Sequence, residues 1–574
     1  MRRRVFLSGA ILTGVGVPLL AGCKLPWQSK RQTGSTSASA SAGKASGTAV
    51  PAASAAPQGW QELDAHVMGH HLGFQVSPLV RRDEKTTVLV LKLTRAKDDP
   101  AVKDVVVDSL DKDSNVFNAA YSLARPGSNP AFEPAAGGVR LLDLSTNRVW
   151  VATTGVENKV KDNYNKLSLK PGASTSCFVL FGAVDAKQVT VFVPQAGFVT
   201  VNVLDSSAAA ASGIDFKAID KAFDSATMPH TRDKADPKQV LEAPVPIERY
   251  TKALDDSTST HTGSKDITVT LASDVTFASD SAELTSAADA QLQTVAGQLA
   301  QYPDGGTLTI VGHTDDVQDD AYNQTLSEKR ANAVKTRLEQ LTNLDKWQTS
   351  VSGKGESEPK INDTSDEARA ANRRVEITLT PTGGTTPKNT ATPANGSSAT
   401  PNPTSSKLPD PKGPVAKGAD GVSVKHDNGA QLTITIDHVT RTNGYLLGQL
   451  HTTISTTTDT APDLKQWLTD KEVVFSNSRS EDGSSEPTEH AADGLTLLAG
   501  GERIYPADYR DADFKTHVPL TELALTPFIK AGTTTICVVW PDPGGDTITL
   551  DHLPAPHLGS SYAYRLTDIP IKNS

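Results

Sequence analysis

The stretch Thr307–Arg337, TLTIVGHTDDVQDDAYNQTLSEKRANAVKTR, decides the fold of the central part of the chain. It begins with alternating apolar residues, which predict a strand ending near Gly312. A polar loop follows, and apolar residues at helical spacing then predict a helix over 325–341. Thr325 and Glu328 stand three positions apart, as in a capping box that satisfies the free backbone donors of a helix start.

This arrangement holds two opposite charges on rigid elements. Asp315 follows the end of the predicted strand, and Arg330 lies in the early turns of the predicted helix. A guanidinium binds a carboxylate through two parallel N–H bonds, and a carboxylate accepts hydrogen bonds from an ammonium group. The pair therefore suits a zwitterionic ligand, although the two side chains can alternatively pair with each other on the surface.

Five motifs appear in a fixed order around this stretch. They are GHTD at 312–315, Asn323, LSEKRA at 326–331, GKGESEP at 353–359 and NRRVEI at 372–377. Together they resemble the OmpA-like peptidoglycan-binding domain, and the segment FASDSAEL at 277–284 is a looser match. The resemblance implies an α+β fold in which helices cover one mixed sheet.

The resemblance also implies a binding site. In that family the aspartate of GHTD and the arginine of LSxxRA hold the diaminopimelate of the peptidoglycan stem peptide. Carried over, these residues are Asp315 and Arg330, and Asn323 and Arg373 fall on motif positions that line the same pocket. Thr314, within GHTD, completes the expected ligand-binding set.

Length and charge limit the possible classes of protein. A chain of 574 residues is too long for one core and indicates three or four domains. Its net charge is −10, and Lys and Arg are not gathered into the basic stripe that nucleic acid requires. Aromatic residues make up only 5% of a chain rich in Thr, Ala, Ser and Gly, which favours β-sandwiches and linkers over a large α/β enzyme.

The N-terminus has the pattern of an export signal. Arginines at 2–4 precede a short apolar stretch at 5–20, too short and too broken by glycine to span a bilayer. The sequence LAGC at 20–23 resembles the lipobox of bacterial lipoproteins, which implies that Cys23 carries lipid such as palmitate. The same arginines resemble a twin-arginine signal, and an uncleaved membrane anchor is the alternative.

Composition shifts divide the chain into seven parts. The expected order is a lipoprotein signal peptide (1–23), a flexible tether (24–58), an immunoglobulin-like β-sandwich (59–205), a linker with short helical pieces (206–263), the OmpA-like domain (264–382), a Pro/Thr-rich linker (383–418) and a second immunoglobulin-like β-sandwich (419–574). The predicted fold class is thus multidomain, with a central α+β domain between two all-β sandwiches joined by disordered linkers.

The first and last domains look like copies of one unit. Segment 138–150 corresponds to segment 494–505, and KPG followed by Cys177 corresponds to KAG followed by Cys537, with the same spacing from glycine to cysteine. These strands resemble the immunoglobulin-like domain of secreted bacterial lipoproteins, with chance similarity of two Thr-rich β-domains as the alternative. Equivalent cysteines inside separate domains cannot meet, so both are predicted to be unpaired.

The chain lacks the sequence patterns of the common catalytic and metal sites. It contains no HExxH, paired CxxC, P-loop or GxSxG motif, and His313 is expected to orient the loop. We therefore predict no catalytic residue, no cofactor and no metal. The wider prediction is a non-enzymatic, extracytoplasmic protein that is lipid-anchored to the cell membrane and bound to peptidoglycan.

The twin-arginine pattern and the Thr/Pro linkers favour a Gram-positive envelope; in a diderm cell the protein would lie at the outer membrane or in the periplasm. The sequence does not identify a protein partner for the two β-sandwiches. One alternative is a surface receptor or adhesin whose sandwiches bind the main partner. Another is a wall-remodelling enzyme or the activator of one.

Overall fold

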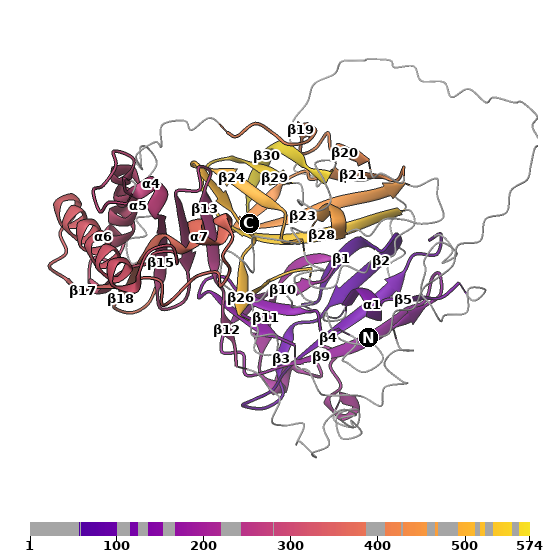
Figure 1. Ribbon diagram of the computed structural model, residues 1–574. Coiled ribbons are helices and arrows are strands. Elements are labelled where there is room, and N and C mark those ends of the chain that lie inside the picture. The colour runs from indigo at the N-terminus through magenta and orange to yellow at the C-terminus, as the bar shows by residue number, and fades with distance from the viewer. Residues whose placement is uncertain are drawn as a thin grey trace, which may run out of the picture. The chain divides into compact units, whose positions relative to one another are not determined.

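Two β-domains and a helix-covered sheet make up the described part of this computed structural model (Figure 1). The structure describes residues 57, 59–99, 115–123, 136–152, 167–219, 243–278, 280–385, 408–425, 429–455, 465–468, 492–510, 517–522, 532–553 and 562–574. Within these ranges, every helix is too short or too polar to cross a membrane. The predicted signal peptide, Cys23 and the tether lie outside the described residues.

The first β-domain forms most of a sheet with the strand order β1-β2-β4-β3-β11-β10-β6-β7-β12, and β9 pairs with β4. Its elements are β1 (Gln61–Val67), β2 (His70–Val76), β3 (Leu79–Arg81), β4 (Thr87–Arg95), β5 (Phe117–Asn118), α1 (Ala120–Leu123), β6 (Arg140–Asp143), β7 (Arg148–Val151), β8 (Ser168–Leu169), β9 (Ser174–Phe181), β10 (Gln188–Val193), β11 (Gly197–Leu204), η2 (Ser206–Ala208) and β12 (Val245–Pro246). Apolar side chains, mainly leucines, alternate with more exposed ones along β2 and β4, so one face of each strand is buried.

The central domain is a mixed sheet with the order β17-β16-β18-β15-β14-β13, in which β16 and β17 are parallel. Its elements are β13 (Arg249–Ala253), β14 (Thr258–Thr262), β15 (Ile267–Ala272), α4 (Ser273–Thr276), α5 (Ala288–Ala300), β16 (Gly306–Gly312), α6 (Asp320–Leu341), β17 (Trp347–Gly353), α7 (Asp366–Asn372) and β18 (Arg374–Pro381). One core joins helices and sheet, including Leu292, Val295, Leu308, Ile310, Val334, Leu338, Val375 and Ile377. The predicted α+β arrangement is present here.

The predicted capping box is wrong. Helix α6 begins earlier than the sequence pattern indicated, and the side chain of Asp319 accepts a hydrogen bond from the backbone N–H of Tyr322. Thr325 therefore lies inside the helix, where its hydroxyl donates to the carbonyl of Ala321 at 2.9 Å. Asp is as good a helix cap as Thr, and the earlier residue supplies the cap, so the spacing of Thr325 and Glu328 is incidental.

The second β-domain continues the sheet of the central domain in the order β13-β25-β24-β29-β30-β22-β23-β21-β20, and β28 pairs with β23. Its elements are β19 (Val415–Lys417), β20 (Val422–Lys425), β21 (Gln431–Thr435), β22 (Val439–Thr442), β23 (Tyr445–Ser455), α8 (Lys465–Leu468), β24 (Thr496–Ala499), β25 (Glu502–Ile504), β26 (Asp508–Arg510), β27 (His517–Pro519), β28 (Gly532–Pro541), β29 (Thr547–His552) and β30 (Tyr564–Asn573).

The strand orders confirm the internal repeat. Strands β1, β2, β4, β3, β11, β10, β6 and β7 of the first domain have counterparts in β20, β21, β23, β22, β30, β29, β24 and β25 of the second. Even the parallel contact of β3 with β11 recurs as β22 with β30. Cys177 lies in β9 and Cys537 in its counterpart β28, and both are free thiols as predicted. The immunoglobulin-like assignment remains a prediction.

The end of the predicted linker 206–263 is part of the sheets. β12 pairs with β7 at the edge of the first β-domain, and β13 pairs with β25 at the same position of the second. β14 then pairs with both β13 and β15, so one hairpin joins the central sheet to the second β-domain. The prediction missed these strands because Pro, Thr and charged residues in this segment lack an apolar alternation.

Candidate functional site

The loop between β16 and α6 is held tightly against neighbouring backbone. The N–H of His313 donates to the carbonyl of Arg374, and the N–H of Thr314 donates to the carbonyl of Gly355, both at 2.9 Å. At Gly312 an added Cβ would lie 2.2 Å from the carbonyl oxygen of Ser327 in α6, so only glycine allows this close crossing. These contacts define where the next residue, Asp315, can lie.

Asp315 pairs with an arginine, although not with Arg330. Its Oδ2 accepts a hydrogen bond from Nη1 of Arg373 at 2.7 Å, and its side chain is only 13% exposed. Arg373 also donates from Nε and Nη2 to both carboxylate oxygens of Asp274, at 2.7 and 2.6 Å. The bond to Asp274, together with that to Asp315, raises the pKa of Arg373 above its ordinary value. The cation is therefore bracketed by two carboxylates.

Arg330 projects from α6 and is largely buried, with 5% of its surface exposed. Its Nε donates to the carbonyl of Ser281 at 2.9 Å, and its guanidinium carbon lies 5.2 Å from the centre of the Phe277 ring. Burial lowers the pKa of Arg330, and the negative charges of Asp274 and Asp280 oppose that effect. Within the described residues, neither Nη atom of Arg330 has a protein hydrogen-bond partner, so these donors stay open to a ligand.

Asn323 ties the loop to its surroundings. Its Nδ2 donates to the carbonyls of Asp315 and Gln318, at 3.2 and 3.1 Å, and to Oε2 of Glu356 at 2.6 Å. With its amide donors used in this way, Asn323 acts by positioning the backbone of Asp315. The structure thus gives this motif residue a supporting position.

Two further residues of the GHTD motif are buried without side-chain hydrogen bonds. The hydroxyl of Thr314 and both ring nitrogens of His313 have no hydrogen-bond partner among the described residues. Burial, and next the charge of Arg374, lowers the pKa of His313 to about 4, so the ring is neutral near pH 7. A neutral, packed ring agrees with the predicted role of His313 in orienting the loop.

The structure brings four of the five predicted residues into one network and adds others. Asp315 contacts Arg373 directly, and the charge of Asp274 acts on both Arg373 and Arg330. The alternative in which Asp315 and Arg330 pair with each other is not observed in this region. Asp274, Phe277, Ser281 and Glu356 were missed. Glu356 stands inside GKGESEP, and two others stand in FASDSAEL, so the looser motif carried a signal.

The comparisons with known proteins identify the segment that carries this network. Residues 276–373 match the model of the OmpA family, and this part of the chain is an OmpA-like domain. Outer membrane porin F of Pseudomonas aeruginosa is 42% identical over 103 residues, which cover 18% of this chain and 29% of that protein. The probable lipoprotein YiaD of Escherichia coli is 35% identical over 116 residues, covering 20% of this chain and 52% of YiaD.

Solved structures are similar to about a fifth of the chain. The cell wall anchor of the T6SS from Pseudomonas aeruginosa is 27% identical, with a TM-score of 0.20, and covers 22% of this chain and 90% of that one. The peptidoglycan-associated lipoprotein of Burkholderia pseudomallei is also 27% identical, with a TM-score of 0.16. That match covers 20% of this chain and 87% of the lipoprotein chain. Since the matched segment spans only 29% of porin F and 52% of YiaD, the activities of those whole proteins do not transfer to this chain.

Proposed function

We propose that this protein is a non-catalytic, lipid-anchored envelope protein that binds peptidoglycan through the diaminopimelate of the stem peptide. The observation that carries the proposal is the state of Arg330. It is a largely buried arginine in an OmpA-like domain, close to a carboxylate network, and neither of its Nη atoms has a hydrogen-bond partner among the described residues. A buried guanidinium with unused donors favours an anionic partner, because burial of an unpaired charge is unfavourable.

The side chain of diaminopimelate ends in a carboxylate and an ammonium group. In our proposal, Arg330 donates from its two Nη atoms to the carboxylate. Asp315 accepts from the ammonium. Its Oδ1 is available because, among the described residues, the one hydrogen bond to that atom is long, 3.4 Å from the backbone nitrogen of Val317. Arg373 holds Asp315 in place, and Asn323 holds the backbone.

Affinity for one stem peptide should be moderate. Each charge-assisted hydrogen bond contributes roughly 1.5–3 kcal/mol, and ordering of the ligand reduces the sum. The wall presents the same peptide many times, and a lipid on Cys23 would hold the domain close to it. Effective concentration then stabilises attachment beyond the affinity of a single site. The membrane and the wall are the two partners of this proposal.

A pull-down with purified sacculi tests the site. Arg330→Ala should weaken retention of the protein by roughly 2–5 kcal/mol, because it leaves the ligand carboxylate unpaired, and Asp315→Ala should weaken it by a similar amount. Arg337→Ala is the matched control. It removes an arginine from the same helix, one that pairs with Asp289 on the surface, and should leave retention unchanged.

Sacculi that contain lysine in place of diaminopimelate test specificity. Lysine lacks the second carboxylate, so the wild-type protein should bind these walls as weakly as Arg330→Ala binds ordinary ones. Equal retention of the wild type on both walls would contradict the diaminopimelate assignment. Unchanged retention of Arg330→Ala and Asp315→Ala would contradict the site itself.

A further inference from the structure

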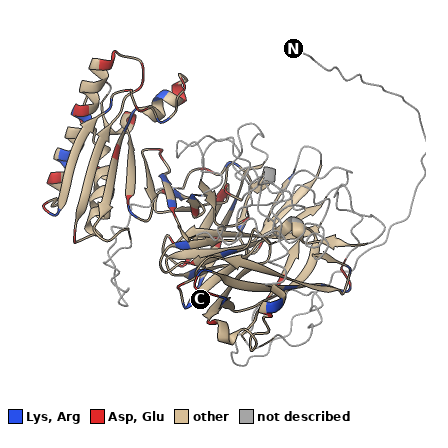
Figure 2. Ribbon diagram, turned by 90° about the horizontal axis from the view of Figure 1, so that it is seen from below, with Lys and Arg blue, Asp and Glu red and all other residues tan. Residues whose placement is uncertain are grey.

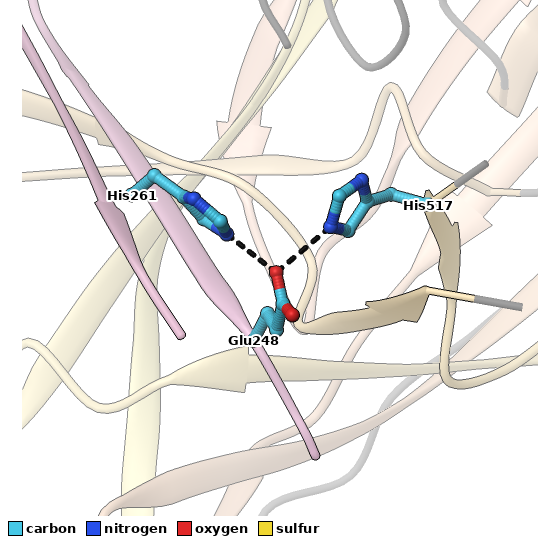
Figure 3. Close-up of side chains that lie close together, drawn as sticks. All are labelled: Glu248, His261 and His517. Carbon is cyan, nitrogen blue, oxygen red and sulfur yellow. Dashed lines mark hydrogen bonds and ion pairs between the residues drawn. The ribbon is translucent and has the colours of Figure 1, made fainter. Parts of the chain in front are cut away.

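Two histidines and a glutamate meet where the hairpin β13–β14 joins the second β-domain. Nε2 of His261 lies 2.5 Å from Oε2 of Glu248, and Nε2 of His517 lies 2.8 Å from the same oxygen (Figure 3). The two imidazole rings approach edge to face, with their centres 5.6 Å apart. Each ring therefore directs one nitrogen at a common point occupied by the carboxylate.

We propose that Glu248, His261 and His517 form a binding site for a divalent transition-metal ion of the zinc class. One donor atom from each residue lies within 4.8 Å of the other two, and in the described part of the chain this is the single His, Cys, Asp and Glu group with that property. Ligand atoms around a tetrahedral zinc ion are separated by roughly 3.3 Å, given bonds of about 2.0–2.1 Å. A small outward rotation of the side chains makes that room.

The backbone positions these donors independently of any ion. Glu248 lies between β12 and β13, and its N–H and carbonyl both bond to Asp508 of β26, at 2.7 and 3.1 Å. β26 pairs with β27 and places Arg510 opposite His517. Tyr250 of β13 stands opposite His261 of β14. The three donors are thus held by strand pairing, which lowers the ordering cost of binding an ion.

Donor chemistry and exposure favour one kind of ion. Imidazole nitrogen with one carboxylate oxygen suits zinc, cobalt, nickel and copper better than magnesium or calcium, which prefer oxygen ligands. The side chains of Glu248 and His517 are 15% and 10% exposed, whereas that of His261 is 30% exposed. The cluster is shielded on most sides, with an opening beside His261 where water can supply a fourth ligand.

An ion at this point would link three segments, of which the one with His517 lies 269 positions from Glu248. Glu248 belongs to the connection between the domains, His261 to the hairpin of the central sheet, and His517 to the second β-domain. The consequence is structural: the ion would lock the hairpin onto β26 and β27. This inference does not depend on peptidoglycan binding, because none of its residues belongs to the Asp315 network.

Metal binding by the untagged, chelator-treated full chain tests the proposal. Titration with zinc chloride should give one tight equivalent by calorimetry, and cobalt chloride should give the visible absorption of a four- or five-coordinate Co²⁺ ion. Zinc should also raise the melting temperature, since an ion that binds only the folded state stabilises it.

Glutamine variants separate ligation from folding. His261→Gln and His517→Gln each keep an amide that can donate to Glu248, but they remove a good metal ligand. Each should weaken zinc binding at least about tenfold, since even outer-shell changes at metal sites cost 10–100-fold. His438→Gln, a half-buried histidine of the second β-domain outside the cluster, should bind like the wild type.

The absence of saturable zinc binding by the wild type would overturn the proposal and leave the cluster as an ion pair only. Tight binding that persists unchanged in both glutamine variants would also overturn it, because the ion would then sit elsewhere. Circular dichroism of each variant establishes that the fold is retained.

Discussion

The two β-domains have the same strand order, yet they end in different ways. In the first, β12 is the last described strand of the sheet, and β7 is its one partner among the described strands. In the second, β13 occupies the equivalent place beside β25, but β14 pairs with its other side and the sheet continues into the OmpA-like domain. A single segment, 245–253, supplies both strands.

This difference shows how one copy of a repeated β-domain is joined to another domain, here the OmpA-like domain. Pro246 lies within β12, where the open edge of the sheet tolerates a residue that lacks an N–H. β13 has neighbours on both sides and contains no proline. Figure 2 shows acidic and basic residues scattered over the ribbon. The join itself is made by strand pairing, of β13 with β25 on one side and with β14 on the other.

The two β-domains also contact each other through Glu522. Substitution of this residue should have the largest effect on stability. This buried side chain accepts a hydrogen bond from the N–H of Gln195 in the first β-domain, at 3.0 Å, and from that of Cys537 in the second, at 2.9 Å. Burial raises the pKa of Glu522 from 4.5 to about 7, although the two backbone bonds oppose the shift.

Glu522→Gln should remove a pH dependence of stability. Between pH 4.5 and about 7, the folded protein binds this proton more strongly than the unfolded chain, so the free energy of unfolding falls as pH rises through that window. The total change is on the order of 3 kcal/mol, and the variant should lack it and be more stable than the wild type at pH 8. Urea unfolding at pH 5 and pH 8 measures both.

Glu62→Gln is the control for this comparison, because Glu62 is an exposed residue of the first β-domain that bonds to Gln75. It should follow the wild-type pH profile. A Glu522→Gln profile parallel to that of the wild type would show that this carboxyl does not titrate between the two copies.

Thr251→Pro should break the attachment that distinguishes the second copy. Thr251 lies opposite Thr260 in β14 and Ile504 in β25, so proline removes a ladder hydrogen bond in the interior of the sheet. A buried group left unpaired costs about 1–3 kcal/mol. Thr251→Ser keeps the backbone N–H and the hydroxyl that bonds to Glu502, and should be near neutral in thermal unfolding. If the two variants melt together, β13 is not an interior strand in solution.

The smallest effect concerns the equivalent cysteines. Cys537 is fully buried in a core that includes residues of both copies, whereas Cys177 is partly exposed. Cys537→Ala should therefore lower the free energy of unfolding by about 1 kcal/mol, and Cys177→Ala by less than about 0.5 kcal/mol. Equal losses in denaturant unfolding would mean that the two positions are packed alike.

Local patterns predicted much of the fold because they report on local forces. Alternation along β4 and β15 and helical spacing in α5 and α6 follow from burial of one face, and both were read correctly. The first residue of helix α6 was harder to predict, because Asp319 and Thr325 are both good N-cap residues and only packing selects one of them. Strands β12 to β14 were missed because their stability comes from partners that lie far along the chain.

For the site, the motifs located Asp315, Arg330, Asn323, Thr314 and Arg373 in one domain, but not their pairing. Only the structure placed Arg373, rather than Arg330, against Asp315. The partner of a charged side chain depends on which opposite charges the fold brings within hydrogen-bond distance. Sequence alone determined the repeat, the unpaired cysteines and the OmpA-like segment, because short contiguous motifs identify each of them. The clusters around Glu248 and Glu522 were decided by tertiary structure, because each includes one residue from hundreds of positions away, His517 for Glu248 and Gln195 for Glu522, which arrives only when the sheets are assembled.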